Sequence, residues 1–229
     1  TSTDELRPAM TGVFFELNGG NVTFVATDGH RLIRYRRTDI NSGDENTLIV
    51  PRKALNLLKS SLPTEKTVVK AEFSQSNAFF TFDNIRMICR LIDERFPDYA
   101  NAIPKNNPNH LSINRLELLA SLRRIAIYAN RATNQVRLRI TPKEVRISAE
   151  DLDFSNEAVE RLPCEYNGEE MEIGFNARFL IEMLSNLTAR DVVIELSAPN
   201  RAGLILPKEK DDNEDMLMLV MPVMLNNYA

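Results

Sequence analysis

The chain has 229 residues, of which 43% are hydrophobic and 26% charged, and its net charge is −4. This composition is typical of a globular protein rather than a disordered one, and no apolar run reaches the roughly 18–20 residues of a membrane span. The first eight residues are polar and show no signal peptide. Two single cysteines, Cys89 and Cys164, argue against a disulfide framework or a cysteine metal site and fit a reducing cytosol, so we expect a cytoplasmic protein without membrane contact.

The sequence contains a long-period repeat. Residues 13–28 and 136–151 both read as strand, tight turn and strand, at an offset of 123 (136 − 13 and 151 − 28). The turns fall at 18–21 and 141–144, and alternating apolar residues flank both. We therefore expect one α+β domain written twice.

The second half of each copy also repeats, with a strand that leads into a helix. Pro51 suits the first turn of one helix and Asn176 suits the N-cap of the other. Their apolar faces carry Leu55, Leu58 and Leu62 in the first copy and Leu180, Met183, Leu184 and Leu187 in the second. Strands are then expected at 67–73 and 79–82, and at 192–196 and 204–206, with an offset of 125 (193 − 68).

A helix expected at 114–130 has no counterpart in the first copy. Asn114 can cap it, and Glu117 completes a capping-box pattern. Because 114 − 123 is negative, the first copy has no room for this helix, and we expect the chain to be a fragment that begins inside a domain. Prolines and asparagines at 104–108 indicate a boundary between domains 1-106 and 107-229, and the charged stretch 208–215 reads as a solvated loop rather than an acidic docking patch.

No motif for a nucleotide loop, a zinc site or a metalloprotease occurs, so we expect no cofactor and no metal. Asp28 and His30 can be read as a hydrolytic pair, but an Asp-Gly-His sequence is more typical of a structural turn. A solvated loop is likewise a simpler reading of the carboxylates Asp93, Glu94 and Asp98 than a metal site.

Positive charge gathers on two of the expected helices. The helix at 114–130 shows Arg115, Arg123 and Arg124 against the single acid Glu117, and Arg131 follows it. The helix after Pro51 carries Arg52, Lys53 and Lys59 and no acid. Such segregated charge suits contact with phosphates without base reading, although an ordinary solvated helix face would look the same.

Five segments resemble the bacterial sliding clamp, the β subunit of DNA polymerase III, in the order expected for its second and third domains. The segment 26–32, Ala-Thr-Asp-Gly-His-Arg-Leu, is similar to a signature of the middle domain. The others are 49–53 at a strand-to-helix junction, 95–99 with 103–105 at the link between domains, 171–176 in the third domain, and 220–223 at the C-terminus.

The resemblance implies repeated clamp domains with β-sheets outside and helices lining the DNA side, two copies being present of an expected three. Family members close as head-to-tail homodimer rings around double-stranded DNA, through the first domain of one subunit and the third of the other. This chain is therefore not expected to close such a ring. It would be a processivity factor rather than an enzyme, and would tether its partners to DNA of any sequence.

The resemblance also implies two sets of binding residues. DNA contacts are expected from Arg7, Arg52, Lys53, Arg123 and Arg124. A hydrophobic pocket between the two domains would bind short peptides of the DNA polymerase III α subunit, the clamp loader, other DNA polymerases and repair proteins. Its expected wall is Met10, Thr27, Gly29, His30, Arg31, Leu32, Pro97, Ala102, Phe179, Leu219, Met221, Pro222, Val223, Met224 and Leu225.

Some positions depart from the family pattern. Ala102 is smaller than the usual residue, Phe179 lacks a tyrosine hydroxyl, and the tail 226–229 continues past the usual end and would lie near the pocket. Two other hypotheses stay open at this point. One is a hydrolase of unknown type centred on Asp28 and His30, and the other is a structural module without a pocket.

Overall fold

The computed structural model of the chain describes residues 1–43 and 45–225, so the expected course of the tail 226–229 lies outside the described residues. The chain divides into two compact units. Unit 1 comprises Thr1–Ala100 with Asn213–Asp215, and unit 2 comprises Asn101–Asp212 with Met216–Ala229.

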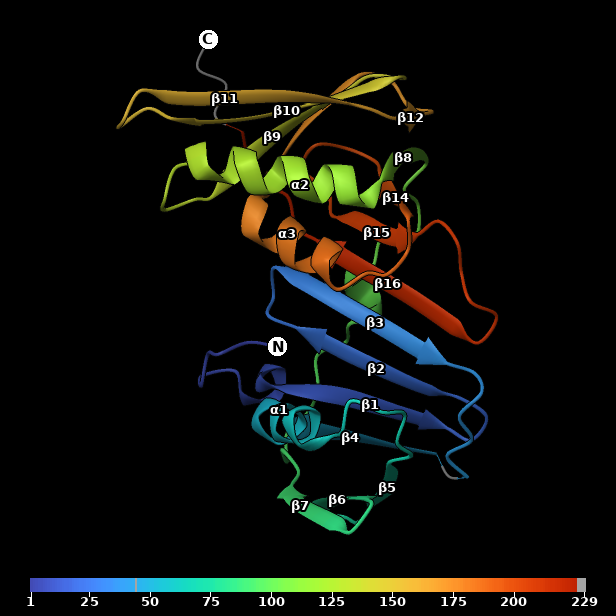
Figure 1. Cartoon of the computed structure of the whole chain (residues 1–229). Coiled ribbons are helices and arrows are strands. Elements are labelled where there is room, and N and C mark those ends of the chain that lie inside the picture. Colours follow the sequence, from blue (N-terminus) through green and yellow to red (C-terminus); the bar gives the residue numbers. More distant parts are fainter. Residues whose placement is uncertain (44, 226–229) are drawn as a thin grey trace. The chain divides into compact units, whose positions relative to one another are not determined.

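In its described residues, unit 1 contains two antiparallel sheets and one α-helix (Figure 1). In the larger sheet the strands lie in the order β3-β2-β1-β4, and in the smaller one in the order β5-β6-β7. The elements are β1 (Gly12–Asn18), β2 (Val22–Thr27), β3 (Arg31–Arg37), β4 (Glu45–Pro51), α1 (Arg52–Ser61), β5 (Lys70–Phe73), β6 (Asn77–Phe82) and β7 (Ile85–Arg90), with short 3-10 turns at Pro8–Thr11 and Ala100–Ala102.

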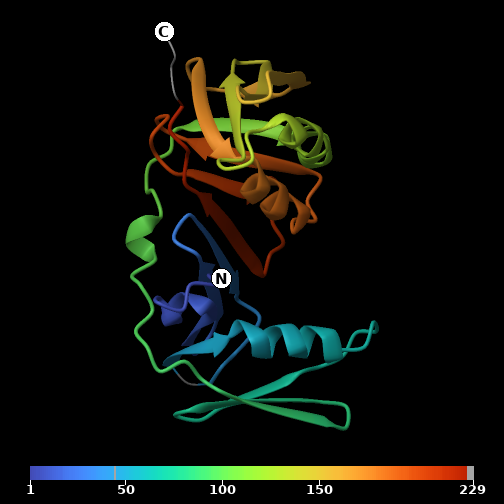
Figure 2. The ribbon, with the colours of Figure 1, turned by 90° about the vertical axis from the view of Figure 1, so that its left-hand side faces the viewer.

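The core of unit 1 lies where α1 meets both sheets, and Figure 2 shows this helix beside the small sheet. Phe15 and Val50 come from the larger sheet and Phe80 from the smaller, and Leu55 and Leu58 of α1 pack against this cluster. The leucine spacing thus does place the apolar face of α1 on the core, as the periodicity predicts.

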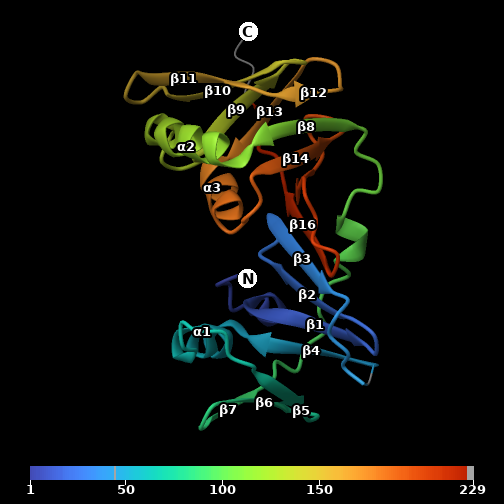
Figure 3. The ribbon, with the colours of Figure 1, turned by 45° about the vertical axis from the view of Figure 1, so that its right-hand side comes forward.

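Unit 2 has the same parts and two additional elements at its start (Figure 3). Its four-stranded sheet has the order β11-β10-β9-β13, and its second sheet continues in the order β12-β8-β14-β15-β16. The elements are β8 (Asn109–Asn114), α2 (Arg115–Ile125), β9 (Gln135–Ile140), β10 (Glu144–Asp151), β11 (Asn156–Pro163), β12 (Glu165–Tyr166), β13 (Met171–Asn176), α3 (Ala177–Ser185), β14 (Asp191–Leu196), β15 (Gly203–Pro207) and β16 (Glu214–Val220).

The strand orders confirm the repeat, because β3-β2-β1-β4 and β11-β10-β9-β13 match in order of appearance along the chain. Within the described residues, unit 1 has no counterpart of β8 and α2. Asn114 and Asn176 cap their helices as expected, and each side chain accepts two backbone N–H groups of the first turn. The expected α+β repeat is therefore correct.

Several local boundaries differ from the predicted ones; the strands expected at 79–82, 192–196 and 204–206, for example, extend over 77–82, 191–196 and 203–207. The helix expected to reach 130 ends at Ile125 and continues as a 3-10 turn, because the Asn130 side chain accepts the amides of Ala132 and Thr133 and leads the chain into a turn. Pro51 is the N-cap of α1 rather than part of its first turn. The strand expected from residue 67 begins at Lys70, which pairs with Thr81 near the end of β6.

Among residues 1–43 and 45–225, the structure contains no helix with the length and apolar character needed to cross a membrane.

Candidate functional site

The predicted peptide-binding residues divide between the two units. Those in unit 1, called here the turn group, are Met10, Thr27, Gly29, His30, Arg31, Leu32 and Pro97. Those in unit 2, called the tail group, are Ala102, Phe179, Leu219, Met221, Pro222, Val223, Met224 and Leu225.

The centre of the turn group is the β2–β3 connection, which side-chain hydrogen bonds hold in one conformation. The Thr27 hydroxyl donates to the Arg31 carbonyl at 2.8 Å and accepts the Gly29 amide at 3.1 Å. Gly29 has a φ of +90°, a conformation that L side chains rarely adopt, so a glycine is required here. The sequence Thr-Asp-Gly-His-Arg therefore sets the shape of the turn before any ligand binds.

Asp28 uses both carboxylate oxygens within this turn. Its Oδ1 accepts the amides of His30 and Arg31 at 3.0 Å each, and its Oδ2 accepts Arg31 Nε at 2.9 Å. Partial burial raises the pKa of Asp28, but the hydrogen bonds from Arg31 and the two amides outweigh burial and keep this pKa below its usual value. Such a carboxylate is suited to holding a turn and poorly suited to acting as a base, so the geometry does not favour the hydrolytic pair.

Arg7, expected at the DNA surface, lies against this same turn. Its Nη1 would be 2.9 Å from a Cβ atom built on Gly29, so a larger residue at that position would displace the guanidinium. Arg7 Nε also donates to Asp4 Oδ2 at 2.9 Å, and this bond lowers the pKa of Asp4. The arginine side chain stays about half exposed and can still reach an anion in solvent.

The tail group begins where β16 ends and the chain crosses β13. The Val223 amide donates to the Gly174 carbonyl at 2.8 Å. A Cβ atom on Gly174 would lie 2.5 Å from the Val223 carbonyl oxygen and 2.7 Å from Leu225 Cδ2, so the close approach depends on glycine. This contact fixes the backbone from which the neighbouring methionines project.

The members of the two groups differ in accessibility. Met221 is 43% exposed and Met224 72% exposed, so both present flexible thioether side chains to solvent. Leu32 and Leu219 are buried and can support a binding surface only from beneath. Phe179 is half-buried on α3, and Ala102 is exposed on the short turn Ala100–Ala102.

Two expected DNA-contacting cations occupy the first turn of α1. Arg52 and Lys53 follow the N-cap Pro51, and this turn contains no acidic residue. A cation is unfavourable here, because the N-terminus of a helix carries partial positive charge. In the part of the chain that the structure describes, neither side chain has an acidic partner within 4 Å. Both charges therefore remain available to an anionic ligand.

The two expected DNA-contacting cations of α2 differ from those of α1, because one of them is paired with a carboxylate. Arg124 donates through Nε and Nη2 to the two carboxylate oxygens of Glu160, at 2.7 and 2.6 Å. Arg123 donates to the Ser185 hydroxyl at 3.2 Å and has no carboxylate partner among the described residues. Of the expected DNA contacts on α2, Arg123 is thus the stronger candidate, since Glu160 neutralises much of the charge of Arg124.

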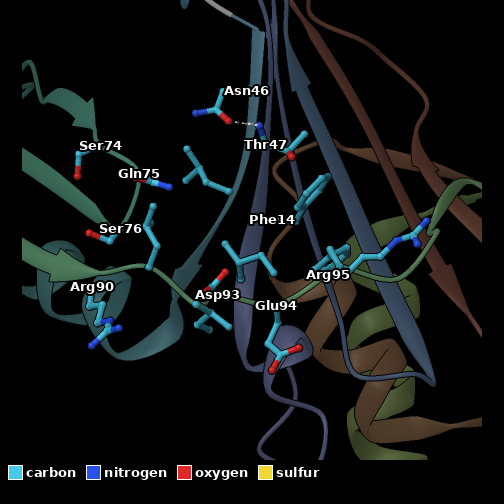
Figure 4. Close-up of a pocket in the computed structure, with 15 residues that line it drawn as sticks. Phe14, Asn46, Thr47, Ser74, Gln75, Ser76, Arg90, Asp93, Glu94 and Arg95 are labelled. Carbon is cyan, nitrogen blue, oxygen red and sulfur yellow. Dashed lines mark hydrogen bonds between the residues drawn. The ribbon is translucent and has the colours of Figure 1, made fainter.

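The carboxylates Asp93 and Glu94 lie in the wall of a pocket of about 700 Å³ in unit 1 (Figure 4). Strand β4 forms another part of the wall, and there the Asn46 side chain accepts a hydrogen bond from the Thr47 amide. No group of three or more potential metal ligands occurs among the described residues. This pocket is therefore polar but gives no sign of a metal centre.

Several exposed apolar side chains on and beside β11 were not predicted. Ile127 is 78% exposed and Phe154 63% exposed, and Tyr128, Leu152 and Val159 are also exposed. We call these five residues the apolar edge, because β11 is the edge strand of its sheet. The helical period could have revealed part of it, since Ile127 and Tyr128 fall outside the buried face formed by Leu118, Leu119, Leu122 and Ile125.

Comparison with protein families matches the two units separately. The family model of the DNA polymerase III beta subunit central domain matches residues 1–98, and that of the C-terminal domain matches residues 100–223. The match covers both the turn group and most of the tail group.

Individual relatives are similar to the chain over most of its length, in agreement with the family match. The chain is 32% identical to the beta sliding clamp of Pseudomonas aeruginosa over 222 residues, which are 96% of this chain and 59% of the relative. It is 32% identical to that of Escherichia coli over 193 residues, which are 84% of this chain and 52% of the relative. The chain thus spans little more than half the length of these relatives.

Solved structures are similar over nearly the whole chain. The crystal structure of the Pseudomonas aeruginosa sliding clamp with ligand superposes with a TM-score of 0.92 at 30% identity, over 98% of this chain and 61% of that one. The sliding clamp of Bacillus subtilis gives a TM-score of 0.92 at 25% identity, over 98% of this chain and 59% of that one.

Proposed function

We propose that this chain, which belongs to the DNA polymerase III beta subunit family, supplies two domains of a sliding clamp that holds a DNA polymerase and other proteins on duplex DNA. In this role it is a processivity factor and not a catalyst. The proposal requires a cationic surface for DNA and an adaptable apolar surface for partners. We expect it to act in the cytoplasm.

The pair Arg52 and Lys53 carries the DNA part of the proposal. Two cations in the first turn of α1 oppose the helix dipole, and no acid in the described residues compensates them. Bound phosphates would supply the missing negative charge, and contacts to phosphates alone permit movement along any sequence. Arg123, and secondarily Arg7 and Arg124, would add to this attraction.

A salt titration tests the DNA surface. We expect two short duplexes of unrelated sequence to bind the chain equally, and binding to weaken as salt rises. Replacing Arg52 and Lys53 by serine should reduce the slope of log K against log salt by about one for each lost phosphate contact. The exposed Lys208→Ser, in the β15–β16 loop, is the matched control and should leave the slope unchanged. An equal loss in the control would show that the attraction is general rather than located on α1.

The partner-binding part of the proposal concerns the turn group and the tail group. The first presents a turn that is already ordered, and the second presents the exposed Met221 and Met224. Methionine side chains can repack around different apolar ligands, which suits a surface with several partners. We infer that short peptides of polymerases, the clamp loader and repair proteins bind these groups and are exchangeable, since two or three buried side chains contribute about 1.5–3 kcal/mol each before ordering costs.

Peptide binding can be measured by fluorescence anisotropy. A labelled peptide of the type Gln-Leu-x-Leu-Phe should bind the chain, and Met221→Ala should weaken binding about tenfold, the equivalent of one partly lost apolar contact. Leu57→Ala is a suitable control, because Leu57 is also an exposed apolar residue but lies on α1. Failure of the unmodified chain to bind the peptide would remove the partner-binding proposal while leaving the DNA proposal intact.

Ring closure is a proposal for the whole protein. The apolar edge combines exposed hydrophobic side chains with the free edge of β11, and such an edge favours addition of another strand. We expect Ile127→Lys to convert a ring-forming dimer of the whole protein to monomers in sedimentation experiments, and Leu57→Lys to leave it dimeric. A dimer that survives Ile127→Lys would place the contact elsewhere.

A further inference from the structure

In unit 1 the chain returns across the outer face of its own four-stranded sheet after β7. The Ile92 amide donates to the Ile49 carbonyl at the edge of β4, at 3.0 Å. Further along the segment, Phe96 stacks on Phe14 of β1, with ring centroids 4.7 Å apart and planes 12° from parallel. Residues 91–99 therefore cover this face as an extended strap.

The strap ends with a polar contact to the same strand. The Tyr99 hydroxyl donates to Glu16 Oε2 at 2.9 Å. Beneath the strap, the side chains of Thr23 and Val25 are fully buried, although both point away from the helix side of the sheet. In unit 1 an extended segment thus covers the face of the four-stranded sheet that points away from the helix.

The strand register identifies the equivalent positions in unit 2. Phe14 pairs with Val25 and Ile49, and Arg137 pairs with Ser148 and Gly174. The same reasoning gives the full set of equivalences: Arg137 for Phe14, Arg139 for Glu16, Arg146 for Thr23, Arg161 for Arg36, and Gly174 for Ile49. Arginines therefore replace the aromatic ring and the carboxylate that the strap contacts in unit 1.

The outer faces of the four-stranded sheets in units 1 and 2 share one backbone contact and differ beyond it. The Val223 amide donates to the Gly174 carbonyl at 2.8 Å, just as Ile92 donates to Ile49 in unit 1. Beyond this point unit 2 has a groove of about 950 Å³ over β9 and β10, whose strands are labelled in Figure 1. Its lining includes Arg137, Arg139 and Arg146.

The charges in this groove are only partly balanced. Arg161, Arg146 and Arg139 stand directly opposite one another on three adjacent strands, and like charges in this arrangement are destabilising. At the β13 side, Glu170 pairs with Arg139, and Glu172 pairs with Arg137 at 2.9 Å and lies 3.9 Å from Arg139. Glu144 lies 3.9 Å from Arg161. Within the described residues, Arg146 has no carboxylate partner, and its buried Nε has no hydrogen-bond partner.

The opposite end of the groove is acidic. Glu150 of β10 pairs directly with Glu157 of β11, and Asp153 lies in the lining beside them. Arg146 and Glu150 are four residues apart on one strand, or about 13 Å at the usual rise of a strand. A ligand for the whole groove must therefore be extended, with acidic groups at one end only.

We propose that this groove binds an extended peptide segment of a partner protein, with an acidic side chain over Arg139 and Arg146 and a neutral or basic one near Glu150. The segment would lie on unit 2 in the way that residues 91–99 lie on unit 1. In unit 1 the Tyr99 hydroxyl of the strap donates to the Glu16 carboxylate of the sheet. In unit 2 the carboxylate would belong to the bound segment and would accept from Arg139 of the sheet, so donor and acceptor change sides. The proposal is independent of DNA binding and of the turn and tail groups.

The strap itself provides a probe. A fluorescein-labelled peptide with the sequence of residues 91–97 carries two acids, Asp93 and Glu94, followed by one base, Arg95, and no acid at its other end. We expect it to bind the full chain in anisotropy measurements, and a peptide with Asn and Gln at the two acidic positions to bind at least tenfold more weakly. Equal binding of the two peptides would overturn the proposal.

Variants of the chain locate the binding. Arg146→Ser should weaken binding of the acidic peptide about tenfold, as expected for loss of one charge-assisted hydrogen bond, whereas Arg146→Lys should retain part of it. Arg201→Ser removes an equal charge from an exposed turn of the same unit and should have no effect. An unchanged affinity in Arg146→Ser, or an equal loss in Arg201→Ser, contradicts a site in the groove.

Thermal melting separates binding from folding. Because Arg146 faces two other arginines, Arg146→Ser should keep or raise the melting temperature, and a large fall would show that Arg146 is structural and overturn the proposal.

A variant that ends after Leu225 tests whether the chain's own C-terminal tail, rather than a partner, occupies the groove. Peptide binding by that variant but not by the full chain would assign the groove to the chain's own tail instead of a partner.

Discussion

Helices α1 and α3 occupy equivalent places in the two units but are buried to different extents. Leu55 corresponds to Leu180 and Leu58 to Met183, each at an offset of 125. In α3, Leu180, Met183 and Leu184 are buried, whereas α1 has no fully buried residue. Both helices pack on their sheets by the same face, so the difference must come from what lies beside them.

The neighbour that unit 1 lacks is α2. Figures 1 and 3 show α2 and α3 side by side in unit 2, and Leu118, Leu119 and Leu122 of α2 are buried there. The described part of unit 1 has no such helix. Periodicity in the sequence therefore determines which face of a helix turns inward, but the number of packed neighbours determines how much that burial stabilises the unit.

The largest effect that we expect tests this difference directly. Leu180→Ala should lower the free energy of unfolding of unit 2 by about 2–5 kcal/mol, the usual range for a fully buried leucine. Leu55→Ala, at the equivalent but half-buried position, should lower that of unit 1 by roughly half as much, since less apolar surface is lost. Urea unfolding followed by hydrogen exchange of amides in each unit measures the two values. Equal losses would mean that α2 adds little to the burial of α3.

The sequence predicted local features well because their causes are local. Asn114 and Asn176 are good caps whatever surrounds them, and both hairpin turns lie at the expected residues. The Arg124–Glu160 pair could not be predicted, since the two residues are 36 positions apart and meet only once β11 packs beside α2. The contacts of the strap join residues more than 80 positions apart, Phe14 with Phe96 and Glu16 with Tyr99, and periodicity does not specify such pairs.

Some features of the site left a signal in the sequence and others did not. The turn at 26–32 carries its own hydrogen-bonding residues, so its shape follows from Thr27, Asp28 and Gly29. The exposure of Met221 and Met224 follows instead from the course of the chain across Gly174. A β-strand ending in apolar residues looks the same in sequence whether those residues fill a core or face solvent.

A second, smaller effect concerns the strap, which only unit 1 has among the described residues. Tyr99→Phe removes the hydrogen bond to Glu16 and should lower the stability of unit 1 by about 0.5–1.5 kcal/mol, with no change in unit 2. Burial, together with the bond to Glu16, raises the pKa of Tyr99 to about 12.

The direction of this pKa shift predicts how the strap responds to alkali. A raised pKa in the folded state means that the stabilisation is complete below the ordinary tyrosine value near 10 and is lost as the pH rises towards about 12. Unit 1 should therefore lose stability over this range, and Tyr99→Phe should reduce that loss. Unit 2 should lose stability as well, because burial raises the pKa values of Cys164 and Tyr166, but its loss should be the same with and without Tyr99→Phe. Denaturation at pH 9 and pH 11 provides the measurement, and a Tyr99→Phe chain with the original pH dependence would contradict the assignment.

The smallest effect compares the charges at the ends of α1 and α2. Lys53 is exposed in the first turn of α1, where a cation opposes the helix dipole, and Arg123 is exposed in the last turn of α2, where a cation is favourable. Lys53→Glu should therefore stabilise unit 1, and Arg123→Glu should destabilise unit 2, by about 0.3–1 kcal/mol each at low ionic strength. Both changes should shrink in 1 M salt, because exposed charges are then screened. If Lys53→Glu raises the free energy of unfolding of unit 1 while weakening DNA binding, then Lys53 destabilises the fold and contributes to binding. That combination is expected of a residue that contacts a ligand. A loss of stability in Lys53→Glu would instead assign the lysine to the packing of unit 1 and weaken the case for a phosphate contact at α1.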